Sequence, residues 1–120
     1  MADRVLFISW GATVRGREER GLEVFNETMG YYGRLQQDGR IESFDVCLLE
    51  PHGDVEGYLQ LHGSSEQIAT LREDEEFQRL TIDASLIVED LRMVEGWTNE
   101  AIAQQMAMYQ EAIAKVPQSA

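Results

Sequence analysis

Val5-Leu6-Phe7-Ile8-Ser9-Trp10 is an unbroken run of β-branched and aromatic residues that ends at Gly11. Such a run is typical of a strand that is buried on both faces. Successive side chains of a strand point to opposite faces, so Phe7 lies on one side and Ile8 on the other. We therefore expect the central strand of a sheet, with apolar surface on both of its sides.

The next 50 residues predict a helix and a β-hairpin. Apolar residues recur at spacings of three and four, which places them on one helix face, and Asp38-Gly39 marks the helix end. The alternating apolar pattern of residues 41–50 and 55–62, with turn residues at 51–54, predicts two paired strands. The residues of the helix face are Leu22, Phe25, Met29, Tyr32 and Leu35.

The second half of the chain predicts two short helices, a fourth strand and a last helix. Ser64 with Gln67 behind it is typical of a helix cap, and the charged residues 72–76 predict a break between two helices. Residues 91–97 are expected to form the strand. Asn99 is expected to cap the final helix, whose apolar stripe is Ile102, Met106, Tyr109 and Ile113.

Length and composition indicate a single domain, residues 1–120. The 22 acidic and 10 basic residues give a net charge of −12, which repels phosphates and anionic lipids, so we expect neither nucleic acid nor membrane as a partner. Cys47 is the only cysteine and lies in an apolar run, which fits a reducing, cytoplasmic setting. The apolar stretches are too short for a signal-peptide core or a membrane span.

The order βαββαβ with a further C-terminal helix and a charged bend at residues 71–80 resembles the ferredoxin-like domains of the dimeric α/β-barrel superfamily. The resemblance covers nearly the whole chain and implies an α+β fold whose four-stranded antiparallel sheet has the order 4-1-3-2. It also implies that the open face of this sheet meets the same face of a second subunit. Members of the superfamily include cofactor-independent monooxygenases, small isomerases and lyases, haem-using enzymes and proteins without known activity.

Subfamily chemistry does not transfer to this chain. The YCII-related proteins resemble it in fold, but they place a histidine near the start of the first helix, where this chain has residues 14–20 without one. No residue matches the motif of the antibiotic-biosynthesis monooxygenases. The fold alone therefore leaves the function open.

The double-sided first strand supports a homodimer independently of the resemblance. Helices cover only one face of a four-stranded sheet, so the second apolar face of the strand requires a partner. A homodimer with a two-fold axis is the commonest solution. The last helix either adds its apolar stripe to that contact or packs on its own domain.

No phosphate-binding glycine loop, nucleophile elbow or metal-ligand set is present in the sequence, so we expect no cofactor and no metal. The candidates that remain are polar and aromatic side chains on predicted strands. Tyr58, Gln60 and His62 alternate onto one face of the third strand. Tyr58 and His62 are about 13 Å apart along the strand, so they belong to different ends of any pocket.

Antiparallel pairing sorts these candidates into two groups. Trp10 approaches Tyr58, whereas Glu95 and Trp97 lie toward the end that holds His62. His62 is either a general acid or base tuned by a carboxylate such as Glu95, or a structural histidine. The three aromatic residues either form a wall for a planar ligand or fill the core and interface.

Two functions are compatible with these residues. In the first, the protein is a small cofactor-independent enzyme or a binding protein that holds an aromatic or polycyclic organic molecule between sheet and helices. Arg15, in the loop after the first strand, would then receive an anionic group of the ligand. In the second, the protein is a non-catalytic dimeric structural or stress-related module, and a filled interior would favour it over a connected cavity.

Overall fold

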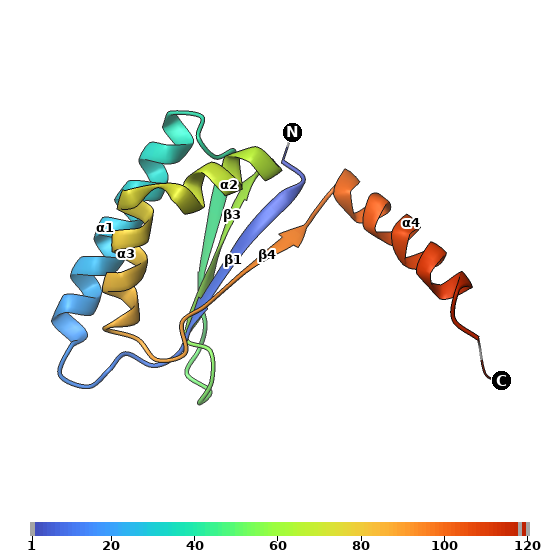
Figure 1. Ribbon diagram of the computed structural model, residues 1–120. Coiled ribbons are helices and arrows are strands. Elements are labelled where there is room, and N and C mark those ends of the chain that lie inside the picture. Colours follow the sequence, from blue (N-terminus) through green and yellow to red (C-terminus); the bar gives the residue numbers. More distant parts are fainter. Residues whose placement is uncertain (1, 118, 120) are drawn as a thin grey trace.

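The computed structural model of the protein describes residues 2–117 and 119, which form four strands and four helices (Figure 1). The order β1–α1–β2–β3–α2–α3–β4–α4 confirms the predicted βαββαβ arrangement with an added helix. The elements are β1 (Arg4–Trp10), α1 (Glu18–Gln37), β2 (Ser43–Leu48), β3 (Gly57–Gly63), α2 (Ser65–Glu73), α3 (Glu75–Ser85), β4 (Arg92–Trp97) and α4 (Glu100–Ala114).

The four strands form one antiparallel sheet in the order β2-β3-β1-β4. This is the predicted order 4-1-3-2 read from the opposite edge, with β1 inside the sheet as expected. In the register, Ile8 of β1 lies opposite Leu59 of β3 and Met93 of β4. Residues directly opposite one another share a face, so the register also fixes which side chains lie on each side of the sheet.

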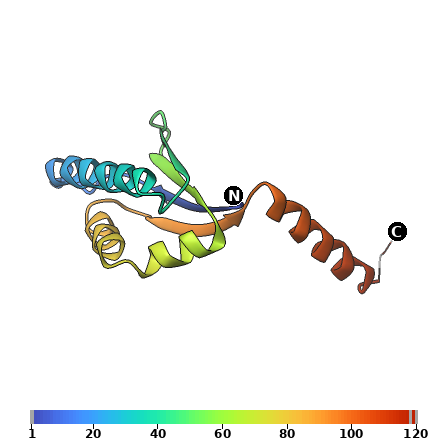
Figure 2. The same cartoon turned by 90° about the horizontal axis from the view of Figure 1, so that it is seen from above.

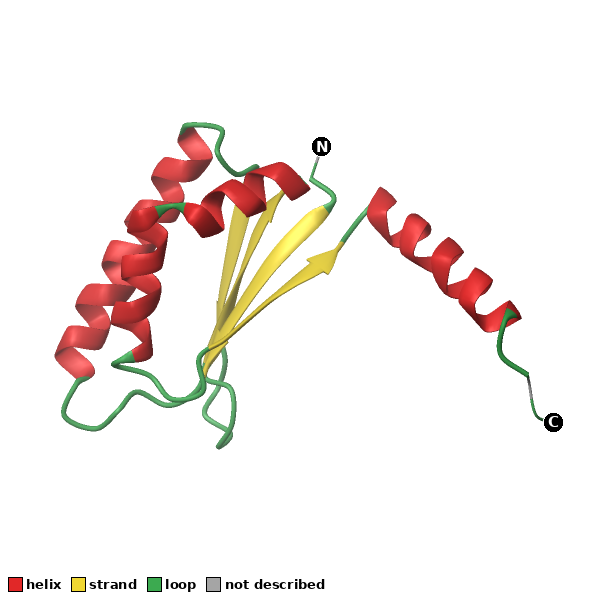
Figure 3. Cartoon of the chain, in the orientation of Figure 1, coloured by secondary structure: helices red, strands yellow, loops and turns green. Residues whose placement is uncertain are grey.

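The helices α1, α2 and α3 lie on one side of the sheet (Figures 1 and 3), and the core forms between them and that face. Leu6 and Ile8 of β1 are 0% and 5% exposed, and Leu61 of β3 lies beside Leu6 in the register. From the helices, Leu35 and Ile68 complete the core. The helix-facing side of β1 is therefore covered within one chain.

Within the part of the chain that the structure describes, no helix covers the other face of the sheet (Figure 3). The register places Phe7 on this open face, beside Gln60 of β3 and Val94 of β4. Val94 is 58% exposed, although it lies next to the central strand. The open face thus carries the second apolar side of β1 that the sequence predicts.

The predicted break in the second helical region lies at Asp74, between α2 and α3. At the start of α2, the Ser64 hydroxyl accepts a hydrogen bond from the Gln67 amide and the Gln67 side chain accepts one from the Ser64 amide. This reciprocal cap confirms the signal read from the sequence. Asp74 then ends α2 and caps α3, because its carboxylate accepts a hydrogen bond from the Phe77 amide.

Asp74 also joins α3 to α1 and the following turn. Its carboxylate accepts a hydrogen bond from the Tyr31 hydroxyl of α1, and the Arg40 guanidinium lies 3.5 Å from its second oxygen. The hydrogen bond from Tyr31, together with the Phe77 amide and Arg40, lowers the pKa of Asp74. An ionised Asp74 therefore stabilises the folded state.

The last helix, α4, projects away from the rest of the molecule on the side of the open face (Figures 1 and 2). Its contacts with the body are with β4, and the Cα radius of gyration is 17.3 Å, against the about 14 Å expected for a compact domain of this length. No helix in residues 2–117 has the length and apolar character needed to cross a membrane.

The structure corrects the expected role of Asn99. This residue precedes α4 as predicted, but its φ is 51° and its side chain makes no capping hydrogen bond. The Asn99 amide nitrogen instead donates to the Ala2 carbonyl oxygen at 2.6 Å. With ψ at −128°, this backbone conformation lies outside the left-handed helical region and is one that residues with a side chain rarely adopt.

We expect Asp74→Ala to reduce the free energy of unfolding by about 2 kcal/mol at neutral pH, because α3 loses its cap and the buried Tyr31 hydroxyl loses its acceptor. Urea unfolding measures the change. Asp74→Asn is the matched control that keeps a capping oxygen but cannot titrate. Folding lowers the pKa of Asp74, so the ionised carboxylate stabilises the folded state at pH values above the ordinary pKa of an aspartate. This stabilisation is lost as the pH falls below that value. The difference between wild type and Asp74→Asn should therefore shrink as the pH falls below roughly 4; a constant difference would contradict this role.

Candidate functional site

A cavity of about 520 Å³ lies between the sheet and the helices α1 and α3. Strands β1, β3 and β4 contribute Ile8, Leu59 and Met93 to one wall, and α1 and α3 form the other. The cavity is located at the end of the sheet where β1 ends and β3 begins. It exists because α1 and α3 diverge from the sheet toward this end, whereas α2 packs closely at the opposite end (Figure 1).

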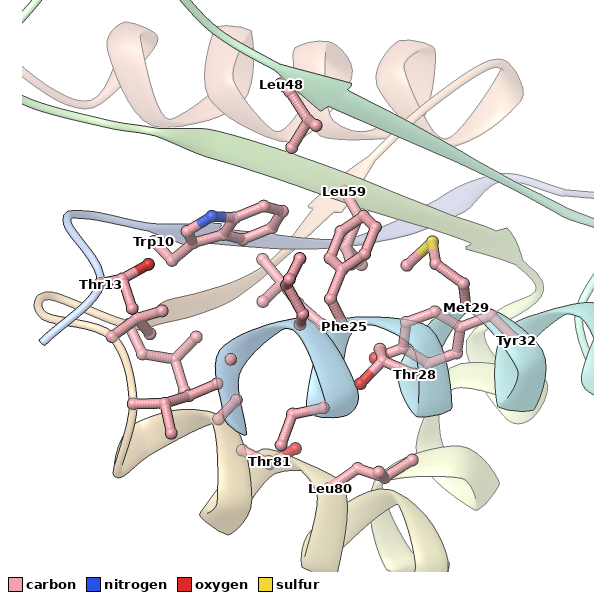
Figure 4. Close-up of a pocket in the computed structure, with 18 of the residues that line it drawn as sticks. Trp10, Thr13, Phe25, Thr28, Met29, Tyr32, Leu48, Leu59, Leu80 and Thr81 are labelled. Carbon is pink, nitrogen blue, oxygen red and sulfur yellow. The ribbon is translucent and has the colours of Figure 1, made fainter. Parts of the chain in front are cut away.

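Aliphatic side chains make up most of the cavity lining, and three aromatic and two methionine side chains lie among them. Trp10 of β1 and Phe25 of α1 approach each other edge to face, with ring centroids 6.5 Å apart. Figure 4 shows these two rings near Leu59, with Met29 and Tyr32 farther along α1. Such a lining offers large polarizable surfaces but few fixed charges, and it suits an apolar ligand.

The polar groups of the lining are hydroxyls, the Trp10 indole N–H and one carboxylate. Thr13, Thr28 and Thr81 contribute hydroxyl groups, and the Thr81 hydroxyl already donates to the Phe77 carbonyl oxygen at 2.9 Å. Among the described residues of the lining, only Glu18 and Tyr32 can ionise, and Glu18 is exposed. Burial raises the pKa of Tyr32, so its side chain is a neutral phenol at physiological pH.

Backbone hydrogen bonds join two loops at one end of the cavity, where Thr13, Ile87 and Val88 line it. The loop after β1 and the loop after α3 run together, with the Gly11 amide donating to the Glu89 carbonyl oxygen at 2.7 Å and the Glu89 amide donating to that of Ala12 at 2.8 Å. The Val14 amide adds a bond of 2.9 Å to the Ile87 carbonyl oxygen. We call this pair of loops the floor of the cavity.

The opposite margin of the cavity is open and apolar. Leu22 of α1 and Leu48 at the end of β2 both line the cavity, yet each is 67% exposed. Figure 4 places Leu48 on the strand that lies across from α1. We call these two residues the rim. Their exposure shows that the cavity opens between α1 and the β2 edge of the sheet.

Gly57 allows Trp10 to adopt its position in the wall. The two residues are paired in the register of β1 and β3. A Cβ atom on Gly57 would lie 2.6 Å from Cζ2 of Trp10 and 2.9 Å from the carbonyl oxygen of Cys47, which are both too close. The missing side chain therefore leaves the room in which the indole lies across β3.

Of the residues predicted to bind a ligand, only Trp10 lines this cavity. Tyr58, Gln60 and His62 lie on the open face, because they pair with Ser9, Phe7 and Val5 of β1. The expectation that they share a pocket with Trp10 between sheet and helices is wrong. The alternation of the strand was read correctly, but the helices cover the apolar row of β3 and not its polar row.

The predicted partner of His62 is also corrected. Its Nε2 atom lies 2.8 Å from Oδ2 of Asp45 on the neighbouring strand β2, whereas Glu95 lies on the helix-facing side of β4. Nearer the hairpin end of the open face, Tyr58 stacks on Phe7 with centroids 5.5 Å apart. A hydrogen bond with Cys47 raises the pKa of the Tyr58 hydroxyl.

Glu95 and Trp97 lie at the end of the sheet that is remote from the cavity. Glu95 forms ion pairs with Arg72 of α2 at 2.7 Å and with Arg4 of β1 at 3.5 Å. The Arg4 guanidinium also lies over the Trp97 ring, 5.5 Å from its centroid. These contacts join α2 to the sheet and give both residues a structural role in the single chain.

The remaining candidate, Arg15, lies on the surface, as does the second histidine of the chain, His52. Arg15 is exposed in the loop before α1, outside the cavity lining. His52 is exposed in the β2–β3 loop, with its Nδ1 atom 2.9 Å from the Glu50 carbonyl oxygen. Within the described part of the chain, no group of three or more His, Cys, Asp or Glu residues is arranged to hold a metal ion.

Sequence reasoning missed most of the lining because its residues have the pattern of an ordinary core. Phe25, Met29 and Tyr32 were identified as one helix face, which is correct. Periodicity shows which face of a helix points inward, but it does not show whether the space opposite is filled. The small residues Gly21 and Ala84, which face the same cavity from α1 and α3, are the only local sign of that space.

The comparisons with known proteins show the fold of this chain and no family. No family model matches the sequence, and no curated protein matches it. Among solved structures, a dimeric protein of unknown function and ferredoxin-like fold from Bacteroides fragilis is similar, with a TM-score of 0.59 at 15% identity over 78% of this chain and 95% of that chain. A NIPSNAP family protein from Agrobacterium tumefaciens has a TM-score of 0.48 at 14% identity over 83% of this chain and 90% of its own. The first similarity confirms the ferredoxin-like fold.

We expect Gly57→Ala to displace the Trp10 ring and reduce the free energy of unfolding by about 1–3 kcal/mol, because the added methyl group overpacks the wall. Urea unfolding measures the loss, and tryptophan emission in a Trp97→Phe background reports the movement of Trp10. Gly33→Ala is the matched control, because a Cβ at that helical position meets no atom within 4 Å. It should be neutral or stabilising. Equal behaviour of the two variants would contradict the role of Gly57.

Proposed function

We propose that this protein is a homodimer that binds a small, largely apolar organic molecule with an aromatic or polycyclic framework in the cavity between its sheet and helices. The cavity itself carries the proposal. Its volume of about 520 Å³ lies within the range of roughly 300–1,000 Å³ that is usual for small-molecule sites. A chain of 120 residues that only needed a stable core would gain from filling such a space.

The lining supports a ligand with flat, apolar surfaces. Trp10 and Phe25 meet edge to face at one end, and Tyr32 lies farther along α1. The neutral Tyr32 phenol and the Thr28 hydroxyl are polar atoms that can orient a ligand with one or two hydrogen-bonding groups. An anionic ligand would have no counter-ion within this lining and would be repelled by Glu18 at its margin.

The same lining favours binding over acid–base catalysis. General acid–base chemistry requires a titratable group within hydrogen-bonding distance of the reacting atoms. Glu18 is exposed at the margin, and the phenol of Tyr32 is held neutral by burial. His62, the catalytic candidate from the sequence, lies on the opposite side of the sheet with Asp45.

The homodimer is supported by the open face of the sheet. Phe7 stacks on Tyr58 at its centre, and Val94 is 58% exposed beside them. Stacking the same face of a second copy on this surface would remove the Phe7–Tyr58 pair and Val94 from water. The Bacteroides fragilis protein of the same fold is described as dimeric. In this arrangement Gln60 and His62 belong to the interface between the sheets.

A dimeric module without a ligand is the second candidate function. The open face favours it equally, since that surface requires a partner whether or not the cavity is used. A module without a ligand offers no explanation for the unfilled space beside Trp10. Measurements of the cavity and of the dimer must therefore be made separately.

We expect Ala84→Phe to weaken binding of a neutral aromatic probe, N-phenyl-1-naphthylamine, by about tenfold or more, because the new ring occupies the cavity. Fluorescence titration of the probe gives the affinity. Ser85→Phe is the matched control, since the adjacent residue of α3 is exposed and outside the lining. It should bind as wild type does. Absence of probe binding to the wild type, or equal loss in both variants, would contradict the ligand-binding proposal.

We expect Phe7→Glu to convert the dimer to monomer, because it places a charge in the centre of the sheet-to-sheet contact. Native mass spectrometry of the purified protein reports the subunit number and any retained small molecule together. Ile82→Glu introduces the same charge at a residue of α3 that is 59% exposed on the helical side, and it should remain dimeric. A wild-type protein that is monomeric, or a Phe7→Glu protein that is dimeric, would contradict the proposed interface.

A further inference from the structure

One chain carries two exposed apolar surfaces that do not meet each other. The first is the α4 stripe, Ile102, Met106 and Tyr109, whose side chains are 48%, 51% and 61% exposed. The second is the rim of the cavity, Leu22 and Leu48. Because α4 projects away from the body, the stripe cannot cover the rim of its own chain (Figures 1 and 2).

The composition of α4 indicates that it packs against protein. Ten of its fifteen residues are apolar, and its only charged residues are Glu100 and Glu111. A helix of this length is marginally stable in water by itself, so it depends on tertiary or quaternary contacts. In a chain with a net charge of −12, such a weakly charged helix is unlike the rest of the surface.

We propose that α4 of each copy packs across the rim of the other copy, so that the partner's helix closes the ligand cavity. The proposal rests on the proposed function for the use of the cavity and for the stacking of the two sheets. It adds that each site is completed by the other subunit. A ligand in the cavity would then contact residues of both copies.

The direction of α4 fits this position. It leaves the sheet after β4, at the end where Arg4 pairs with both Gly63 and Trp97, and it extends on the side of the open face (Figures 1 and 2). A second copy stacked on that face lies directly in its path. If the two-fold axis runs along the strands, the β2 edge of the second copy lies beside β4 of the first. The partner's edge strand is therefore the first surface that α4 meets.

The length of α4 is sufficient to reach the rim. Its fifteen residues span about 22 Å at ~1.5 Å per residue. The strand β2 has six residues and spans about 20 Å at ~3.3 Å per residue. Ser43 lies opposite His62 at the end where α4 starts, and Leu48 lies opposite Gly57 at the cavity end. Met106 and Tyr109, in the second half of α4, would therefore arrive near Leu48 of the second copy.

Charge supports the same placement at the far end of α4. Lys115, the only lysine of the chain, directly follows the helix and is exposed. The first turn of α1 carries Glu18 and Glu19, and Glu18 lies at the open margin of the cavity. A helix that crosses the rim from the β2 edge would bring Lys115 toward these carboxylates.

A second copy is the occupant that accounts for both surfaces. Each chain has one stripe and one rim, so a two-fold pair covers two stripes with two rims and leaves neither exposed. Pairing of one α4 with the other would cover the stripes and leave both cavities open. A different protein bound to α4 would leave the rims exposed as well.

Cross-linking tests this placement. In a Cys47→Ser background, the full-length Leu48→Cys/Tyr109→Cys variant should give a covalent dimer with a short bis-maleimide, observed on a denaturing gel. Leu48→Cys/Gln104→Cys is the matched control, because Gln104 lies on the opposite side of α4 from the stripe at 100° per residue. It should give several-fold less dimer. Equal or absent cross-linking in both variants would overturn the placement of α4.

Two further measurements separate the alternatives. Tyr109→Cys alone, in the same background, should not cross-link, and an efficient cross-link would show that α4 pairs with α4 and overturn the proposal.

Met106→Glu should weaken binding of N-phenyl-1-naphthylamine by about tenfold, while Gln104→Glu binds as wild type. If the Leu48→Cys/Tyr109→Cys variant cross-links but the wild type binds no probe, the proposed function fails and the helix exchange stands. If the probe binds and both Met106→Glu and Gln104→Glu leave the affinity unchanged, the proposed closure fails and the ligand site stands.

Discussion

The two-sided apolar character of β1 is the constraint on which the rest of the structure depends. A sheet of four strands exposes two faces, and three helices are sufficient to cover only one of them. The chain places Leu6 and Ile8 under these helices and leaves Phe7 on the other side. The helix-facing side of β1 is thereby covered within one chain, and the open face keeps apolar side chains exposed to solvent.

The cavity follows from how unevenly the helices cover their face. Near Leu61 and Ile68 the core is fully buried, because α2 packs directly on β1 and β3. Toward Trp10 the helices α1 and α3 pack on each other and diverge from the sheet, which leaves space among aromatic side chains. The closely packed core and the cavity thus occupy opposite ends of one layer.

The element order, the helix break at Asp74 and the cap at Ser64 could be predicted because each depends on local patterns along the chain. The sheet order was instead implied by the resemblance to the ferredoxin-like domains. The candidate site could not be predicted to the same extent. Tyr58 and His62 were correctly assigned to one face of β3, but alternation alone does not say which face the helices cover. The cavity lining has the same periodicity as a filled core, so the sequence identified its aromatic members only as core residues, with Trp10 as the exception.

The floor of the cavity has a kinetic consequence for whatever the cavity holds. Main-chain hydrogen bonds between the loops that follow β1 and α3 join backbone to backbone, so they do not depend on side chains that can rotate away. Exchange of a bound molecule by that route would require local unfolding, whereas the margin at Leu22 and Leu48 is exposed in the single chain. Such a one-ended cavity imposes an order on entry. The part of a ligand that enters the cavity first is the last to leave. This leading part is also the one that contacts the innermost residues of the cavity.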